Sequence, residues 1–202
     1  MSRTAEVRRG ALTTTVVVRL AIDGRGRASV RTGVTAFDQL LETLARHGRF
    51  DLDVEAAGSG GDERVDAHRV VVATGAAWGT AFARALESRE TTRGIGEATV
   101  PVAGALVRAV CDLRGPEVRG SEGAAFLAYQ AAPPAWQLVG DYDVALTPEF
   151  WQAFTGEARV TLHLDLLRGV QGRPITEAAY AAAGRALAAA AERDPRVEGG
   201  SA

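Results

Sequence analysis

The chain has 202 residues and a formal net charge of -2 at pH 7, with 47% hydrophobic and 24% charged residues. These values are ordinary for a soluble globular protein with one large core or two fused smaller units. Arginines and acidic residues are mixed along the chain, and no block of basic residues occurs. This argues against a nucleic acid or an anionic membrane as a partner. The single cysteine, Cys111, excludes an internal disulfide framework, and its apolar neighbours indicate a buried structural thiol.

The beginning of the chain indicates its location in the cell. Residues 1–10 are polar and arginine-rich and lack the apolar region of a signal peptide. No uncharged apolar stretch reaches the length of about 18 residues that a membrane helix needs. We therefore expect a cytoplasmic protein without a membrane segment.

The first half begins with a β-branched, apolar stretch at residues 13–22, which ends in the turn signal Asp23-Gly24. This pattern predicts a hairpin whose second strand covers residues 27–34. A helix with leucines at helical spacing, a short alternating strand and a second helix follow at 37–48, 52–56 and 67–86.

The second half repeats this order. It has strands at 106–113 and 124–130, a helix opened by Thr147-Pro148-Glu149, a strand at 159–166 and an alanine-rich helix at 175–191.

Two such ββαβα units imply a duplication. We expect an α+β fold in which each half is a mainly antiparallel, four-stranded sheet packed against two helices. The halves are placed at residues 1–95 and 96–192, with a loose tail at 193–202.

Four short motifs follow one another along the chain: FDQLL at 37–41, VDAHR at 65–69, TLH at 161–163 and DPRV at 194–197. In this order they resemble the imidazoleglycerol-phosphate dehydratase family in its actinobacterial form, over about residues 5–198. The resemblance implies active sites between subunits and trimers that metals assemble into 24-subunit shells.

The resemblance also implies two manganese ions, held by eight histidine and carboxylate ligands. At those positions the chain keeps the family's residue only at His68 and Glu177. The other six positions are occupied by Gln39, Arg69, Val72, Glu149, Arg173 and Pro174. Because a guanidinium cannot lose its proton or coordinate a metal, we expect no metal site, no cofactor and no manganese dehydratase.

The positions that the resemblance assigns to substrate binding have changed as well. Of two tandem arginines only Arg93 remains, and Gly94 stands in place of the other; Ala181 stands in place of a helix lysine. A phosphate needs several positive or N–H donors together, and few remain at these positions. Imidazoleglycerol phosphate is therefore not the expected substrate.

At the positions that the resemblance assigns to metal ligands, Arg69, Glu149, Arg173 and Glu177 alternate in charge. Two interpretations of this pattern stay open. Salt bridges could fill the vacated site and hold a subunit interface, or a new pocket could grip an anionic or carbonyl substrate. For the pocket, the expected catalytic residues are His68, Glu149 and Glu177, and the expected substrate-binding residues are Arg69, Arg173, Arg93 and Gln39.

Three histidines have different expected roles. His68 follows Asp66 and begins a helix, where the helix dipole disfavours its cation, so we expect a neutral base there. His47 and His163 lie outside the ligand set that the resemblance implies, and we expect structural hydrogen bonds from both.

Three functions remain open. The leading hypothesis is a metal-independent enzyme, recruited into actinobacterial specialised metabolism, that catalyses a dehydration, cyclisation or isomerisation. The second is a catalytically dead scaffold or partner subunit, and the third is a working dehydratase of histidine biosynthesis. The expected partners are a small-molecule substrate and copies of the same chain, in a trimer without the shell.

Overall fold

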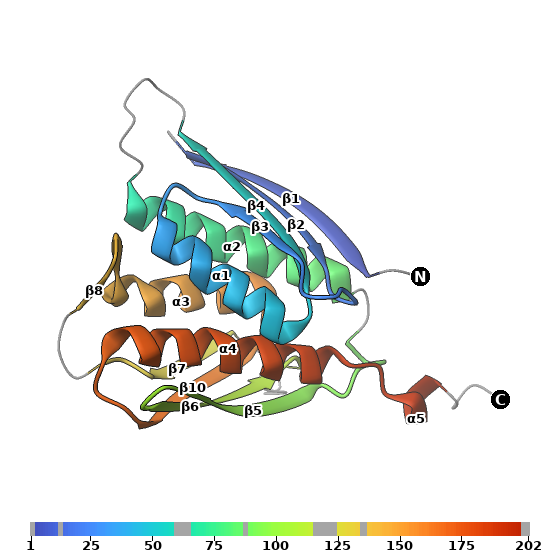
Figure 1. Ribbon diagram of the computed structural model, residues 1–202. Helices are drawn as coiled ribbons and strands as arrows, with labels where there is room; N and C mark the ends of the chain where they lie inside the picture. Colours follow the sequence, from blue (N-terminus) through green and yellow to red (C-terminus); the bar gives the residue numbers. More distant parts are fainter. Residues whose placement is uncertain are drawn as a thin grey trace.

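The structure is a computed structural model that describes residues 3–11, 14–58, 66–86, 89–114, 125–133 and 137–198. In this part of the chain two four-stranded sheets enclose a layer of four long helices (Figure 1).

The first sheet has the strand order β1-β2-β4-β3, formed by Thr4–Ala11, Thr14–Ala21, Asp51–Gly58 and Ala28–Arg31 in that order. β1 and β4 pair with β2 antiparallel, whereas β3 pairs with β4 in parallel. The helix α1 (Thr35–Gly48) connects β3 to β4, as a parallel pair requires.

The predicted hairpin at Asp23-Gly24 is therefore wrong, because β3 contacts β4 and not β2. The turn itself exists, but it leads into a loop that Asp51 holds. The Asp51 carboxylate accepts hydrogen bonds from the backbone N–H groups of Arg25 and Arg27, at 2.8 and 3.0 Å. This attachment carries the chain past β2 to the far side of β4.

The second sheet repeats the same strand order as β5-β6-β10-β7. Its strands are Ile95–Val102, Ala105–Asp112, Thr161–Arg168 and Phe126–Gln130. Two antiparallel pairs and one parallel pair occur in the same places as in the first sheet. The α+β fold with duplicated, four-stranded halves is thus confirmed. The sheet of each half contains one strand, β1 or β5, before the three that the sequence predicts.

Between β7 and β10 the chain forms a small hairpin and two helical segments. They are β8 (Leu138–Val139), β9 (Tyr142–Asp143), the short 3-10 helix η1 (Val144–Leu146) and α3 (Thr147–Ala158).

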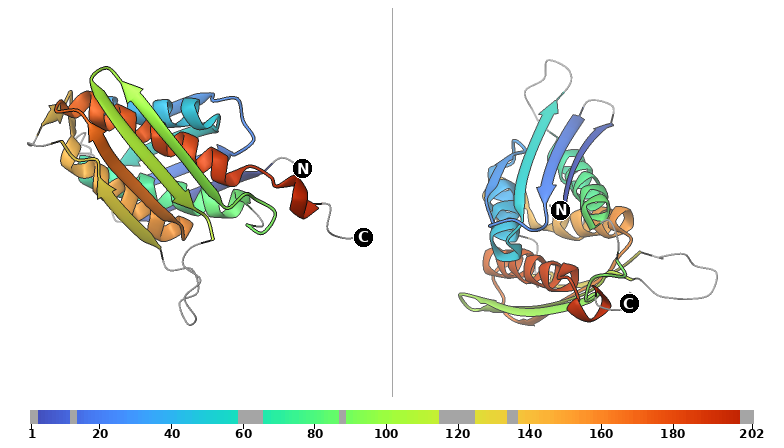
Figure 2. Two further views of the ribbon diagram at one scale, coloured as in Figure 1. Left: turned by 90° about the horizontal axis from the view of Figure 1, so that it is seen from below. Right: turned by 90° about the vertical axis from the view of Figure 1, so that its right-hand side faces the viewer.

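The helices pack across the two halves. α1 and α2 (Ala67–Leu86) lie under the first sheet, and α3 and α4 (Gly172–Ala191) lie on the second (Figures 1 and 2). α2 packs on α3 and α1 packs on α4, so each helix pair joins one half to the other. The duplicated halves, predicted at 1–95 and 96–192, therefore share one helical layer.

Small residues allow both helix pairs to approach closely. A Cβ atom added at Gly75 would lie 2.5 Å from the backbone oxygen of Phe150, and one added at Gly184 would lie 2.5 Å from that of Leu44. Around the α2/α3 contact the core is aromatic, and the rings of Trp78 and Phe154 stack with centroids 4.3 Å apart.

Cys111 is fully buried on β6, as the sequence predicts. Burial raises the pKa of its thiol far above the ordinary value, so the reactive thiolate does not form there.

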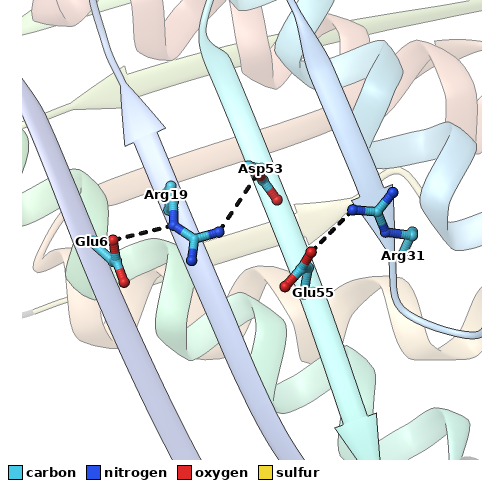
Figure 3. A network of polar contacts seen from close by, with 5 residues as sticks. All are labelled: Glu6, Arg19, Arg31, Asp53 and Glu55. Atoms are coloured by element: carbon cyan, nitrogen blue, oxygen red, sulfur yellow. Dashed lines mark hydrogen bonds and ion pairs between the residues drawn. The ribbon is translucent and has the colours of Figure 1, made fainter.

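The outer face of the first sheet carries charged side chains that pair across the strands (Figure 3). Arg19 on β2 contacts Glu6 on β1 at 3.2 Å and Asp53 on β4 at 3.7 Å, and Arg31 on β3 contacts Glu55 on β4 at 3.0 Å. Opposite charges on neighbouring strands favour this register and give the sheet a polar outer face.

The tail that the sequence predicts to be loose is attached at its beginning. Arg193 forms an isolated bridge with Thr92, and the backbone N–H of Asp194 donates to Thr91 at 2.9 Å. One helical turn, α5 (Pro195–Glu198), follows. Within the described residues no helix is both long and apolar enough to span a bilayer.

Candidate functional site

All four long helices begin at the same end of the molecule, on the left of Figure 1. Six of the seven predicted site residues lie in the first two turns of these helices, and we call this region the helix-start end. They are Gln39 on α1, His68 and Arg69 on α2, Glu149 on α3, and Arg173 and Glu177 on α4.

His68 and Glu149 form the closest contact of this region. The Nε2 atom of His68 lies 2.5 Å from Oε2 of Glu149, although 81 residues separate them in the chain. Both side chains remain about half exposed, at 56% and 47%. The pair therefore joins the two halves at a place that a solute can reach.

The start of α2 fixes the position of His68. The Asp66 carboxylate accepts a hydrogen bond from the backbone N–H of Arg69 at 3.3 Å, which caps the helix. The same carboxylate pairs with the Arg69 guanidinium at 3.0 Å. Arg69 is thus bound to the residue that begins its own helix.

The start of α3 fixes the position of Glu149. Pro148 lies in the first turn, where its missing N–H costs no hydrogen bond. The buried Thr147 hydroxyl is 3.0 Å from the hydroxyl of Tyr142. Burial raises the pKa of Tyr142 to about 12, so its phenol stays protonated and able to donate.

The start of α1 is held by the opposite half. Asp141, between β8 and β9, accepts hydrogen bonds from the backbone N–H groups of Thr35 and Ala36 at 2.7 and 2.9 Å. Although partial burial raises it, these bonds keep the pKa of Asp141 below its ordinary value. Asp141 could not be identified from local sequence patterns, because a capping residue about a hundred positions away from its helix leaves no local signal.

The other predicted residues do not join the His68 pair within one chain. Arg173 contacts Glu177 on its own helix at 2.8 Å. Gln39 is exposed, and its side chain makes no hydrogen bond with the described residues. Arg93 lies at the opposite end, 3.2 Å from Glu192 beyond the end of α4.

The charges of the helix-start end therefore form separate pairs and not the single alternating network that the sequence suggests. Arg69 pairs with Asp66, His68 with Glu149, and Arg173 with Glu177. Each arginine is neutralised by a carboxylate that lies on its own helix or immediately before it.

Within a single chain, the side chains described at this end do not form a two-metal centre. Among the described residues no group of three or more histidine, cysteine, aspartate or glutamate side chains is arranged to hold a metal ion. Two of the positions that would carry ligands present guanidinium groups, Arg69 and Arg173, which cannot coordinate. The pair His68 and Glu149 can instead exchange protons, because an imidazole and a carboxylate in contact form a general acid–base unit.

The chain is similar to known proteins over almost its whole length. A family model described as imidazoleglycerol-phosphate dehydratase matches residues 32–187. The imidazoleglycerol-phosphate dehydratase of Aromatoleum aromaticum is 42% identical over 198 residues, which cover 98% of this chain and 95% of that protein. The protein of the same name from Pelobacter propionicus is 40% identical over 199 residues, covering 98% and 96%.

Solved structures agree with this similarity in fold. The crystal structure of imidazoleglycerol-phosphate dehydratase from Staphylococcus aureus matches with a TM-score of 0.78 and 24% identity, over 95% of this chain and 99% of that one. A Pyrococcus furiosus structure with the same family name, in complex with (S)-C348, matches with a TM-score of 0.70 and 22% identity, over 96% and 97%.

Proposed function

Because the chain belongs to the imidazoleglycerol-phosphate dehydratase family, we propose that it is a dehydratase that removes water from a small hydroxylated substrate by acid–base catalysis. The contact between His68 and Glu149 carries this proposal. It places a base and its orienting carboxylate at an accessible end of the molecule.

The geometry of the pair gives each member a role. Since the Glu149 carboxylate accepts a hydrogen bond at Nε2 of His68, the proton of the neutral ring lies on Nε2, and Nδ1 keeps a free lone pair. Nδ1 then removes a proton from the carbon adjacent to the one that bears the departing hydroxyl, and the electron pair of that C–H bond forms the new double bond as the C–O bond breaks. Glu149 stabilises the imidazolium that forms, as the carboxylate does in other histidine–carboxylate pairs.

A departing hydroxyl needs a proton, and we assign its donation to Glu177, which would have to take up a proton and separate from Arg173 when the substrate binds. The anionic or carbonyl part of the substrate is assigned to Gln39, Arg69 and Arg173 at the same end. Arg93 lies at the other end, so its assigned role requires a neighbouring copy in the predicted trimer.

The proposal is independent of bound metal. The family resemblance implies manganese, but arginines occupy two of the ligand positions, and the described residues offer no cluster that fits. No step of the proposed reaction uses a metal ion. We expect elemental analysis after dialysis against excess manganese to find less than one ion per chain.

The first substrate to test is imidazoleglycerol phosphate, since the relatives at 40–42% identity carry its name. Their coverage of almost the whole chain favours the histidine-biosynthesis dehydratase over a role in specialised metabolism. The changes at Gly94 and Ala181 support a second candidate, a related hydroxylated compound of an actinobacterial specialised pathway. The assignment to a divergent, actinobacterial-type branch belongs to this second candidate.

The test is a turnover assay with imidazoleglycerol phosphate, run in excess chelator and again with manganese, with mass spectrometry detecting the loss of one water. We expect turnover in chelator, and a decrease of about 10²- to 10⁴-fold in His68→Gln. The matched control is His163→Gln, on the outer face of the second sheet beside Phe126, with unchanged turnover expected.

The outcomes separate the open functions. Turnover that appears only with manganese would refute metal independence. Full activity in His68→Gln would place the chemistry elsewhere. If neither imidazoleglycerol phosphate nor related hydroxylated compounds react, the scaffold hypothesis replaces the dehydratase.

A further inference from the structure

A hollow of about 770 Å³ lies where the last turn of α1 meets α4 and the edge strand β5. We call it the basic pocket. Its volume is in the range of sites that hold small molecules. The side chains that line it and can bind a polar ligand are those of Arg46, His47, Arg49, Glu97, Thr99 and Arg185.

The arginines of the basic pocket have no carboxylate partners among the described residues. Arg46 donates to the Thr43 hydroxyl at 3.1 Å, and Arg185 donates to His47 at 3.2 Å. No described carboxylate lies within ion-pair distance of Arg46, Arg49 or Arg185. The lining of the pocket thus contains three guanidinium groups and one carboxylate, that of Glu97, which forms an ion pair with none of them.

His47 adds a neutral donor to these charges. Arg185 can only donate, so Nδ1 of His47 accepts, and the proton of the neutral ring lies on Nε2. Burial lowers the pKa of His47, and the charges of Arg185 and Arg46 lower it further. The part of this shift that comes from Arg185 and Arg46 reflects the two positive charges close to His47.

Backbone contacts fix the shape of the basic pocket. Gly48 and Gly184 bring α1 against α4, which sets His47 beside Arg185. Arg49 ends α1 in the left-handed conformation, with a φ of 55°, and its backbone N–H bonds to the last turn of the helix. Because these elements are fixed, a ligand would not have to order them.

We propose that the basic pocket binds the phosphate group of a small molecule, through Arg46, Arg49, Arg185 and the Nε2–H of His47. A phosphate presents several acceptor oxygens and up to two charges, which matches three guanidinium donors and one imidazole donor. At Gly94 and Ala181 the chain lacks the arginine and the lysine that the family resemblance implies. In the basic pocket the hydrogen-bond donors come from other residues, which only the fold brings together.

The basic pocket is separate from the proposed acid–base pairs. Along α4, Arg185 lies 12 residues beyond Arg173, which is about 18 Å at 1.5 Å per residue. The inference therefore does not depend on the proposed dehydratase activity, and binding can be measured without turnover.

The experiment is calorimetric titration of the full chain with inorganic phosphate and with glycerol phosphate at low ionic strength. We expect saturable binding of both probes. Arg185→Gln and Arg49→Gln should each weaken it about tenfold or more, as expected for a lost charged hydrogen bond. The matched control is Arg84→Gln, an exposed arginine in the last turn of α2 outside the pocket, with unchanged affinity expected.

Two results would overturn the proposal. One is the absence of saturable binding of either probe, and the other is an equal loss in Arg84→Gln, which would indicate a general charge effect. A circular dichroism spectrum of each variant verifies that it is folded.

If a substrate is found, inhibition by phosphate distinguishes the two sources of the phosphate group. Competitive inhibition that is lost in Arg185→Gln assigns the pocket of a neighbouring copy to the substrate's own phosphate, and non-competitive inhibition assigns it to a separate phosphorylated ligand. Both results uphold the basic pocket as a phosphate site.

Discussion

The two helix pairs of this molecule use the same residue type in opposite ways. On α2/α3, His68 meets the carboxylate of Glu149, and on α1/α4, His47 meets the guanidinium of Arg185. A carboxylate stabilises the imidazolium, whereas a guanidinium opposes it. The first pair is therefore suited to proton transfer and the second to donating a hydrogen bond from a neutral ring, so the partner across the helix contact determines what each histidine can do.

The pairs also differ in how the helices are held. The α2/α3 contact combines glycines with stacked rings, those of Trp78 and Phe154 among them. At the α1/α4 contact Gly184 lies against Gly48 and Leu44, and α4 is rich in alanine. Both contacts are close, and both join the two halves. Changes at each contact should therefore affect its own histidine first.

The largest expected effect is on catalysis at α2/α3. Glu149→Gln should lower kcat/KM by about 10²- to 10⁴-fold, as His68→Gln does, because the two groups act as one acid–base unit. The double variant should be about as slow as the slower single variant. Steady-state kinetics with any substrate that is turned over measure this, and losses that multiply in the double variant would contradict a shared role.

Enlarging a glycine at the α1/α4 contact should come next in size. Gly184→Val inserts side-chain atoms where a Cβ already lies 2.5 Å from the backbone oxygen of Leu44, so we expect a loss of about 1–3 kcal/mol in the free energy of unfolding. The variant should bind phosphate more weakly, because α1 moves from α4. Urea unfolding and titration with phosphate measure the two effects.

Gly156→Ala on α3 is the matched control for that substitution. An added Cβ there meets no atom within 4 Å, so the substitution should stabilise the protein by about 0.5–1 kcal/mol through helix propensity.

Unchanged phosphate affinity in Gly184→Val would show that the close α1/α4 contact does not shape the basic pocket.

The pH dependence of stability should contain a contribution from His47. Because the pKa of His47 is lowered from 6.5, the folded chain binds fewer protons there than the unfolded chain. Its stabilising contribution is present above pH 6.5 and is lost as the pH falls through the folded pKa. Between about pH 7 and pH 5, urea unfolding should show a decrease in stability that is smaller in His47→Gln, and equal slopes would contradict this.

Two carboxylates with lowered pKa values titrate in a separate range. A side-chain hydrogen bond from Arg3 lowers the pKa of Asp23, and two backbone hydrogen bonds lower that of Asp51, both from 3.8. Their stabilisation is lost only as the pH falls below this value, so it does not overlap the range assigned to His47.

The smallest effect is expected at the exposed pair on α4. Arg173 and Glu177 have side-chain exposures of 66% and 32%, and such pairs contribute about 0.3–0.5 kcal/mol. Arg173→Gln should therefore change the free energy of unfolding by less than 1 kcal/mol. A larger loss, or dissociation of an oligomer in light scattering, would support the interface-brace interpretation.

Most of the fold could be predicted from local patterns, but not every strand. The four long helices follow from apolar spacing, caps and first-turn residues such as Pro148. β1 was missed because it carries charged residues around a single buried apolar side chain, Val7. β5 contains Gly96 and Pro101, which weaken a strand pattern.

The candidate site could be predicted only in part. The sequence identified His68 and Glu149, but their contact, the local pairing of Arg69 with Asp66, and the cap from Asp141 emerge only from packing. A side chain's reach depends on which helix lies beside it, and periodicity does not contain that information.

The sequence by itself determined the duplicated α+β fold and the family, because side-chain chemistry and local periodicity do not depend on distant contacts. Only the tertiary structure decided which charges meet. His68 and Glu149 are 81 residues apart, and His47 and Arg185 are 138 apart. Both contacts exist because helices of opposite halves pack against each other, and that packing is a property of the closed core.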